Sequence, residues 1–146
     1  MLWKLYSCSY WIRLCWFPIS FEIAKQQSCN KTNKKLSRNV IGFDINQQRI
    51  AELKSCQDRT QELSESELLQ IKNLKFTFEI NDLLTADIFI ITVPTPIDDS
   101  NQPDINPIIA ATKTIAGVIS KRKTLISPII IYESTVYPGL TEEVCV

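Results

Sequence analysis

The stretch VIGFDINQQRI, residues 40–50, decides the fold. Its first residues, Val40 to Phe43, form a short apolar run that ends on a carboxylate, Asp44. A new pattern then begins, with Ile45, Arg49, Ile50 and Leu53 at the three- and four-residue spacing that predicts a helix. A buried strand that ends in an acid and turns into a helix is typical of the second strand of a dinucleotide-binding sheet.

Two residues of this stretch are candidate ligands of a dinucleotide. At the end of such a strand the acid accepts hydrogen bonds from the adenosine ribose, and its charge disfavours a 2′-phosphate, so Asp44 indicates NAD. Asp is also a common helix N-cap, and the stretch alone leaves open whether Asp44 is only a cap. Arg49, about one helical turn further on, is placed either to lie along the adenine or to pair with Asp44.

The composition excludes several classes of function. The chain has 146 residues, about one domain, with 16 Lys plus Arg balanced by 16 Asp plus Glu, so no global field attracts nucleic acid or an anionic membrane. It has no histidine, which excludes Ser-His and Cys-His dyads and histidine-ligated zinc. The five cysteines show no CxxC spacing, so we predict neither disulfides nor a metal site, and a reducing cytoplasm.

The N-terminal third has no regular pattern. Residues 1–23 are rich in Trp, Tyr, Phe and Cys, but Lys4 and Arg13 interrupt the apolar run and no small-residue cleavage site follows. We therefore predict neither a signal peptide nor a transmembrane helix there. Residues 26–39 are polar and basic, which is more typical of a solvated loop than of a nucleic-acid-binding arm.

From residue 40 onward predicted strands alternate with predicted helices. Further strands are expected at residues 75–78, 88–93 and 126–132. A capping box formed by Ser64 and Glu67 predicts one helix start, and an Asn106 N-cap followed by Pro107 predicts another. This alternation predicts an α/β fold with a parallel sheet.

Polar side chains follow three of the predicted strands. Asp44 ends the first, Thr92 and Thr95 lie near the end of the second, and Ser134 and Thr135 follow the last. Ligands of open α/β sheets bind beyond the carboxyl ends of the strands, so we expect these side chains to converge on one ligand. Taken singly, each serine or threonine is typical of ordinary turn chemistry.

Three separated motifs resemble a known family. They are VIGFDINQQRIAELK (40–54), ADIFIITVPTPID (86–98) and IIIYESTVYPGLTEEVCV (129–146). They are similar to the UDP-glucose/GDP-mannose dehydrogenase family of nucleotide-sugar 6-dehydrogenases, and most similar to its Vi-polysaccharide-type UDP-N-acetylglucosamine 6-dehydrogenases. The resemblance implies oxidation of the sugar C6 alcohol to a carboxylate with two NAD per sugar. It also implies an N-terminal NAD domain, a C-terminal nucleotide-sugar domain and homo-oligomers.

The resemblance also implies roles for individual residues. Asp44 would bind the adenosine ribose, and Arg49 would lie near the adenine. Thr95 and Thr135 would contact the cofactor. The strand end at Glu133, with Tyr137, would lie towards the nicotinamide and the sugar.

The family's catalytic cysteine, with its lysine and asparagine helpers, belongs to the C-terminal domain. The chain ends at Val146, before any counterpart of these residues. We therefore expect no catalytic residue here and no oxidation of a UDP-sugar by this chain alone. Cys145 lies outside that motif and is predicted to be a small buried apolar residue.

One motif of the family is missing. Its members begin with a strand and a GxGxxG turn close to IGLGYVG, and no such turn occurs in this chain. Yet the codons of SYWIRLCWFP, residues 9–18, read one base later, can spell IGLGYVGFP. Glycines are forced by the codons of Trp11 and Trp16 and permitted by that of Arg13.

We therefore interpret residues 1–39 as an aberrant N-terminal segment, a frameshifted reading that starts near Ser7. Residues 40–146 are then a partial NAD-binding Rossmann domain. The alternative is that the aromatic residues form a genuine apolar segment, and the encoding DNA decides between the two.

The expected fold is accordingly an incomplete Rossmann-like parallel sheet with the first strand and the glycine-rich loop disrupted. Because the first strand is central in the order 3-2-1-4-5-6, its loss would leave its two neighbours without a shared partner. NAD binding by the chain as written is expected to be weak or absent. Two other interpretations are a non-catalytic fragment or binding module, and a small protein tethered to a membrane by its aromatic leader.

Overall fold

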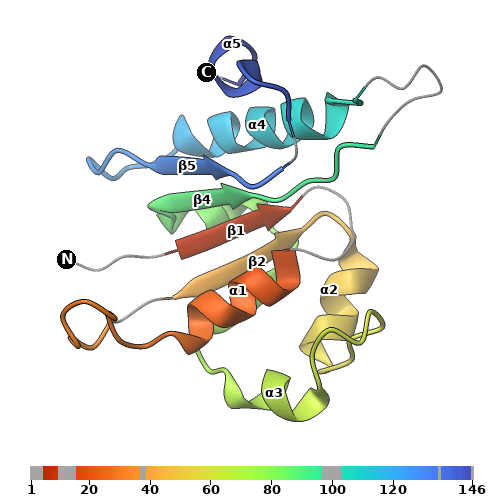
Figure 1. Ribbon diagram of the computed structural model, residues 1–146, viewed down its shortest axis with the longest axis vertical. Helices are drawn as coiled ribbons and strands as arrows, with labels where there is room; N and C mark the ends of the chain where they lie inside the picture. Colours follow the sequence, from red (N-terminus) through yellow and green to blue (C-terminus); the bar gives the residue numbers. More distant parts are fainter. Residues whose placement is uncertain (1–4, 10–15, 37–38, 97–102, 135, 146) are drawn as a thin grey trace.

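The computed structural model describes residues 5–9, 16–36, 39–96, 103–134 and 136–145, with side chains from residue 18 onward. Five parallel strands form one sheet in the order β3-β2-β1-β4-β5 (Figure 1). The strands are β1 (Leu5–Ser9), β2 (Val40–Asp44), β3 (Leu74–Thr77), β4 (Ile88–Ile91) and β5 (Ile129–Tyr132). The predicted α/β class with a parallel sheet is confirmed.

Helices connect these strands and cover the sheet. They are α1 (Trp16–Lys25), α2 (Gln47–Lys54), α3 (Glu65–Gln70), the 3-10 helix η1 (Ile80–Thr85), α4 (Asn106–Ile119) and α5 (Leu140–Glu143). Helix α1 packs on β1, β2 and β3, whereas α4 packs on β4 and η1. Figure 1 shows α1 in front of the sheet and the light-green η1 behind it.

The prediction that the first strand is disrupted is wrong. Residues Leu5–Ser9 form β1 at the centre of the sheet, where Tyr6 is opposite Ile41 of β2 and Phe89 of β4. Strand pairing uses backbone groups, and a central parallel strand is buried on both faces, so a short run without Gly or Pro can occupy this position. The sheet therefore has its central strand. Residues 10–15, where the family's glycine turn would begin, lie outside the described residues.

The segment that follows β1 is also more regular than its sequence indicated. Helix α1 turns Ser20, Phe21 and Ala24 towards the sheet, and all three are buried. Residues one and three positions apart lie on the same face of a helix, and here that face packs on the sheet. The predicted polar loop after α1 contains one isolated bridge between Ser28 and Lys35.

The core lies between β4 and α4. All four residues of β4 are buried, as expected for a strand covered on both faces. Helix α4 contributes one apolar face: Ile108, Ala111, Ile115 and Val118. The predicted Asn106 N-cap is wrong, since Asn106 is the first helical residue and Ile105 precedes it as the cap.

Two local predictions about element starts can be compared with the structure. The capping box is confirmed, because the Ser64 N–H donates to Glu67 Oε2 at 2.9 Å and the Glu67 N–H donates to Ser64 Oγ at 3.4 Å. Strand β5 begins at Ile129, directly after Pro128 and three residues later than the predicted strand at residues 126–132, because proline cannot donate to a strand ladder. No helix within the described part of the chain is long and apolar enough to cross a membrane.

Candidate cofactor site

The strand registers place the predicted polar residues at one edge of the sheet. Asp44 at the end of β2 is opposite Ser9 of β1, and Cys8 is opposite Ile91 of β4. Thr92, the next residue after β4, is therefore level with Asp44 across β1. Thr95 follows three residues further along the chain, whereas Thr135 lies outside the described residues.

Asp44 is fully buried and only half satisfied. Its Oδ1 accepts a hydrogen bond from the Asn46 N–H at 2.8 Å, while its buried Oδ2 has no hydrogen-bond partner among the described residues. The interpretation of Asp44 as a simple N-cap is wrong, because the N-cap of α2 is Asn46, whose side chain accepts from the Arg49 N–H. Buried carboxylate oxygens are rarely left without donors, so this one is placed to accept from a ligand.

Burial raises the pKa of the Asp44 carboxyl above its ordinary value. The hydrogen bond from the Asn46 backbone and the positive charges of Arg49 and Arg59 act in the opposite direction. Further hydrogen-bond donors to the ionised carboxylate would act against this rise. Hydroxyl groups of a ligand would therefore lower the pKa of Asp44 and stabilise the charged acid.

Arg49 is buried beside Asp44 and bound to a residue that the sequence did not single out. Its Nη2 donates to Asp58 Oδ1 at 2.7 Å and to Thr60 Oγ1 at 3.2 Å. Its Nη1 lies 3.7 Å from Glu52 Oε2. The guanidinium is thus held at the first turn of α2, within electrostatic reach of the candidate ribose acid.

Asp58 accepts five hydrogen bonds, from Arg49 Nη2, Thr60 Oγ1 and the backbone N–H groups of Thr60, Glu62 and Leu63. Burial raises the pKa of this carboxyl, but the hydrogen bonds outweigh burial and lower the pKa to about 2. The only sequence signal for this role is the Asp58–Arg59–Thr60 spacing, which is typical of a turn closed by an Asp side chain.

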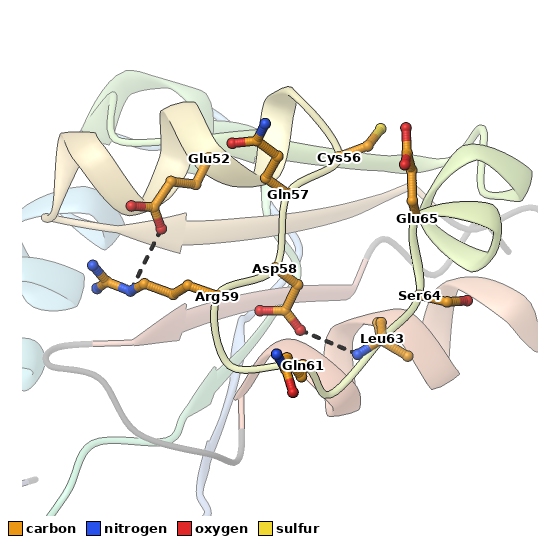
Figure 2. A pocket seen from close by; sticks show the side chains of 9 residues that line it. All are labelled: Glu52, Cys56, Gln57, Asp58, Arg59, Gln61, Leu63, Ser64 and Glu65. Atoms are coloured by element: carbon orange, nitrogen blue, oxygen red, sulfur yellow. Dashed lines mark hydrogen bonds and ion pairs between the residues drawn. The ribbon is translucent and has the colours of Figure 1, made fainter.

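A cavity of about 640 Å³ lies beside Asp58, along the loop that connects α2 to α3 (Figure 2). It is lined by Glu52, Cys56, Gln57, Asp58, Arg59, Gln61, Leu63, Ser64 and Glu65. Figure 2 shows Arg59 reaching towards Glu52, and their Nε and Oε2 atoms are 3.5 Å apart. No residue of the strand ends lines this cavity, although Asp58 and Arg59 belong to its lining.

The β4–β5 side of the edge holds a second unsatisfied atom. The buried Thr92 Oγ1 has no hydrogen-bond partner among the described residues. Ser134 Oγ donates to the Val93 carbonyl at 2.7 Å and so ties the end of β5 to that of β4. Two buried polar atoms without a described hydrogen-bond partner, Asp44 Oδ2 and Thr92 Oγ1, therefore lie at the carboxyl ends of the strands on either side of β1.

This donor and acceptor set fits a nucleotide better than a metal. A buried carboxylate with one open oxygen can accept from a diol, and the carboxyl ends of parallel strands are where dinucleotides bind. The described residues contain no group of three or more His, Cys, Asp or Glu that could hold a metal ion.

Comparisons with known proteins agree with this geometry. The model of the UDP-glucose/GDP-mannose dehydrogenase family, NAD binding domain, matches residues 28–146. The chain is 51% identical over 109 residues to a UDP-N-acetyl-D-glucosamine 6-dehydrogenase of Pseudomonas aeruginosa, and 48% identical over 110 residues to one of Salmonella typhi. Each match covers 75% of this chain and 25% of the relative. The chain thus spans about a quarter of the length of these relatives.

Solved structures show the same fold. A UDP-glucose dehydrogenase from Pyrobaculum islandicum matches with a TM-score of 0.81 and 19% identity, over 99% of this chain and 32% of that chain. A UDP-D-ManNAc dehydrogenase from Pyrococcus horikoshii matches with a TM-score of 0.74 and 25% identity, over 96% of this chain and 31% of that chain. The chain therefore belongs to the UDP-glucose/GDP-mannose dehydrogenase family and corresponds to its NAD binding domain.

Proposed function

We propose that this chain is the NAD-binding part of a cytoplasmic UDP-sugar 6-dehydrogenase of the UDP-N-acetylglucosamine type. The whole enzyme would oxidise the C6 alcohol of the sugar to the uronate for polysaccharide biosynthesis. Two relatives with about half of their aligned residues identical carry the name UDP-N-acetyl-D-glucosamine 6-dehydrogenase, which supports this choice of substrate.

The open Oδ2 of Asp44 is the observation that carries the proposal. This oxygen is buried at the end of β2 without a donor among the described residues, and the ribose hydroxyls of NAD would supply that donor. The negative charge would disfavour the 2′-phosphate of NADP. Arg49 would lie on the adenine side, and Thr95 and Thr135 would contact the cofactor nearer the β4–β5 ends.

Bound NAD would supply the hydride acceptor for the sugar carbon. This chain's own residues would hold the adenosine end, keep Asp44 ionised through the charge of Arg49, and close the β4–β5 end through Ser134. No counterpart of the family's catalytic cysteine motif occurs in the 146 residues, so we expect no sugar oxidation by this chain alone.

Calorimetric titration with NAD tests the proposal. The chain as written has three glycines, at 42, 117 and 139, and none near residues 11–16. Since bulky side chains there would block close approach of the backbone to a pyrophosphate, we expect an affinity weaker than micromolar. A Trp11→Gly/Arg13→Gly/Trp16→Gly variant is expected to bind NAD at least about tenfold more tightly.

The matched control adds Asp44→Asn to the triple-glycine variant. Hydrogen bonds to a charged group contribute about 1.5–3 kcal/mol, so NAD affinity is expected to fall by roughly 10- to 150-fold. NADP is expected to bind the triple-glycine variant more weakly than NAD does. Equal NAD affinity with and without Asp44→Asn would contradict the proposal.

A further inference from the structure

We propose that Asp58 is a positioning residue of the cofactor site: it holds the guanidinium of Arg49, whose backbone N–H is bonded to the turn that carries Asp44. The proposal rests on the function proposed above and deepens it. Asp58 is not expected to touch the cofactor, because its side chain is 1% exposed and its oxygens are occupied by other donors. It acts through Arg49.

A continuous series of polar contacts joins Asp58 to the candidate ribose acid. The Asn46 N–H donates to Asp44 Oδ1 at 2.8 Å, and the Arg49 N–H donates to Asn46 Oδ1 at 3.1 Å. The guanidinium of the same arginine then donates to Asp58 Oδ1 at 2.7 Å. A displacement of Asp58 is therefore transmitted to the turn that orients Asp44.

The two oxygens of Asp58 have different partners. Oδ1 accepts from Arg49 and from the Thr60 hydroxyl, the latter at 2.6 Å. Oδ2 accepts from the backbone N–H groups of Glu62 at 2.8 Å and Leu63 at 3.1 Å. One carboxylate thus fixes both the arginine and the segment that leads into α3.

Burial makes this arrangement specific. The side chains of Arg49 and Asp58 are 4% and 1% exposed. A buried guanidinium that lost its carboxylate would move towards water or another acid, since an unpaired buried charge is costly. The positive charge beside Asp44, which favours the ionised acid, would move with it.

The competing interpretation is that Asp58 only folds the loop between α2 and α3. A purely structural residue would change the stability of the chain without changing the ionisation of Asp44 or the affinity of the folded protein for an adenosine. The positioning role predicts a change in both.

The experiment is an NMR titration of the 146-residue chain with 5′-AMP, a probe of the adenosine end that does not need a pyrophosphate cradle. We expect Asp58→Asn to weaken AMP binding at least fivefold and to raise the pKa of Asp44, followed by its side-chain carboxyl carbon. The matched control is Asp82→Asn. Asp82 also pairs with a cation, Lys75 at 2.7 Å, and accepts from Thr77, but it lies at β3 and η1, so AMP affinity is expected to stay within twofold.

The outcomes separate the two proposals. If neither the unaltered chain nor its triple-glycine variant binds AMP, the proposed function fails and this inference fails with it. If AMP binds and Asp58→Asn changes neither the affinity nor the pKa of Asp44, only the inference is overturned. Should Asp58→Asn not fold, Thr60→Val keeps both charges and removes the hydroxyl shared by Asp58 and Arg49. A two- to threefold weaker AMP affinity supports the inference, and an unchanged affinity overturns it.

Discussion

The two sides of the central strand β1 depart from the usual distribution of side chains in opposite ways. We call the side with β2 and β3 the β2 half, and the side with β4 and β5 the β5 half. At and beside the end of β2 charged side chains are buried: Asp44 is 0% exposed, and the side chains of Arg49 and Asp58 are 4% and 1% exposed. At β5, the outer strand on the other side, apolar groups are exposed: Ile129, Ile130 and Ile131 are 45%, 38% and 37% exposed. Leu125 and Ile126 extend this exposed surface.

The difference shows in which half the side chains find their partners within the chain. Buried charges persist mainly when they are paired. At the β2 end Arg49 is paired with Asp58, while Asp44 Oδ2 and Glu62 Oε1 have no hydrogen-bond partner among the described residues. An outer strand is commonly protected by a charged side chain, and β3 has Lys75, paired with Asp82. Strand β5 has only isoleucines and Tyr132. The β2 half should therefore respond strongly to mutation, and the β5 half weakly.

Removing the buried anion is expected to produce the largest effect. Asp58→Ala removes the nearest carboxylate of the buried Arg49 and the acceptor of three backbone N–H groups, which costs about 3–5 kcal/mol in the free energy of unfolding. Urea unfolding followed by circular dichroism measures it. Asp82→Ala removes a partly exposed pair and should cost less, about 1 kcal/mol. Equal losses in the free energy of unfolding for Asp58→Ala and Asp82→Ala would show that the buried pair contributes no more than the pair at β3.

A matched pair of isoleucines compares the two strands directly. Ile91 of β4 is fully buried, whereas Ile131 of the adjacent β5 is 37% exposed. Ile91→Ala is expected to cost about 2–5 kcal/mol through a lost core side chain and the cavity left behind. Ile131→Ala should cost less than about 1 kcal/mol. If the same urea experiment gave Ile131→Ala the larger loss, β5 would be part of the core.

Acid is expected to lower the free energy of unfolding because it protonates Asp58. Its pKa is about 2 in the folded chain and 3.8 in the reference state, so the folded state binds the proton less readily. This stabilisation is complete above about pH 4 and is lost as the pH falls towards 2; it amounts to about 2 kcal/mol. Asp58→Asn should remove that part of the pH dependence of unfolding. An unchanged slope between pH 4 and 2 would show that Asp58 is not the group responsible.

The smallest effect is expected at Asp44, and it has the opposite sign. Its pKa is raised by burial, so ionisation opposes folding above the unfolded pKa. Asp44→Asn should therefore stabilise the ligand-free chain slightly at pH 7, and this gain should disappear below about pH 4. Thermal unfolding at the two pH values measures this difference. A loss of stability at pH 7 would mean that the carboxylate is already fully satisfied.

Local sequence patterns predicted local features well. The apolar run into Asp44 predicted β2, and the Ser64–Glu67 spacing predicted the start of α3. Both depend on neighbouring residues alone. The Asn106 cap failed because Asp104 Oδ1 accepts the Asn106 N–H at 2.9 Å and draws that residue into the first turn of α4.

Features that depend on distant segments were not predictable. Strand β1 looks irregular in sequence, but two ready neighbours, β2 and β4, provide its backbone partners. Asp58 is one acid in a polar stretch, and its role appears only when the loop folds back onto Arg49. The open oxygen of Asp44 likewise follows from burial and not from spacing.

The most direct test of the central claim is the pKa of Asp44 in the triple-glycine variant, measured by NMR with and without NAD. Ribose hydroxyls that donate to Oδ2 stabilise the carboxylate, so saturating NAD is expected to lower this pKa clearly below its value in the ligand-free chain. If the pKa of Asp44 stays the same at saturating NAD, the cofactor does not contact this acid, and the assignment of the site is wrong.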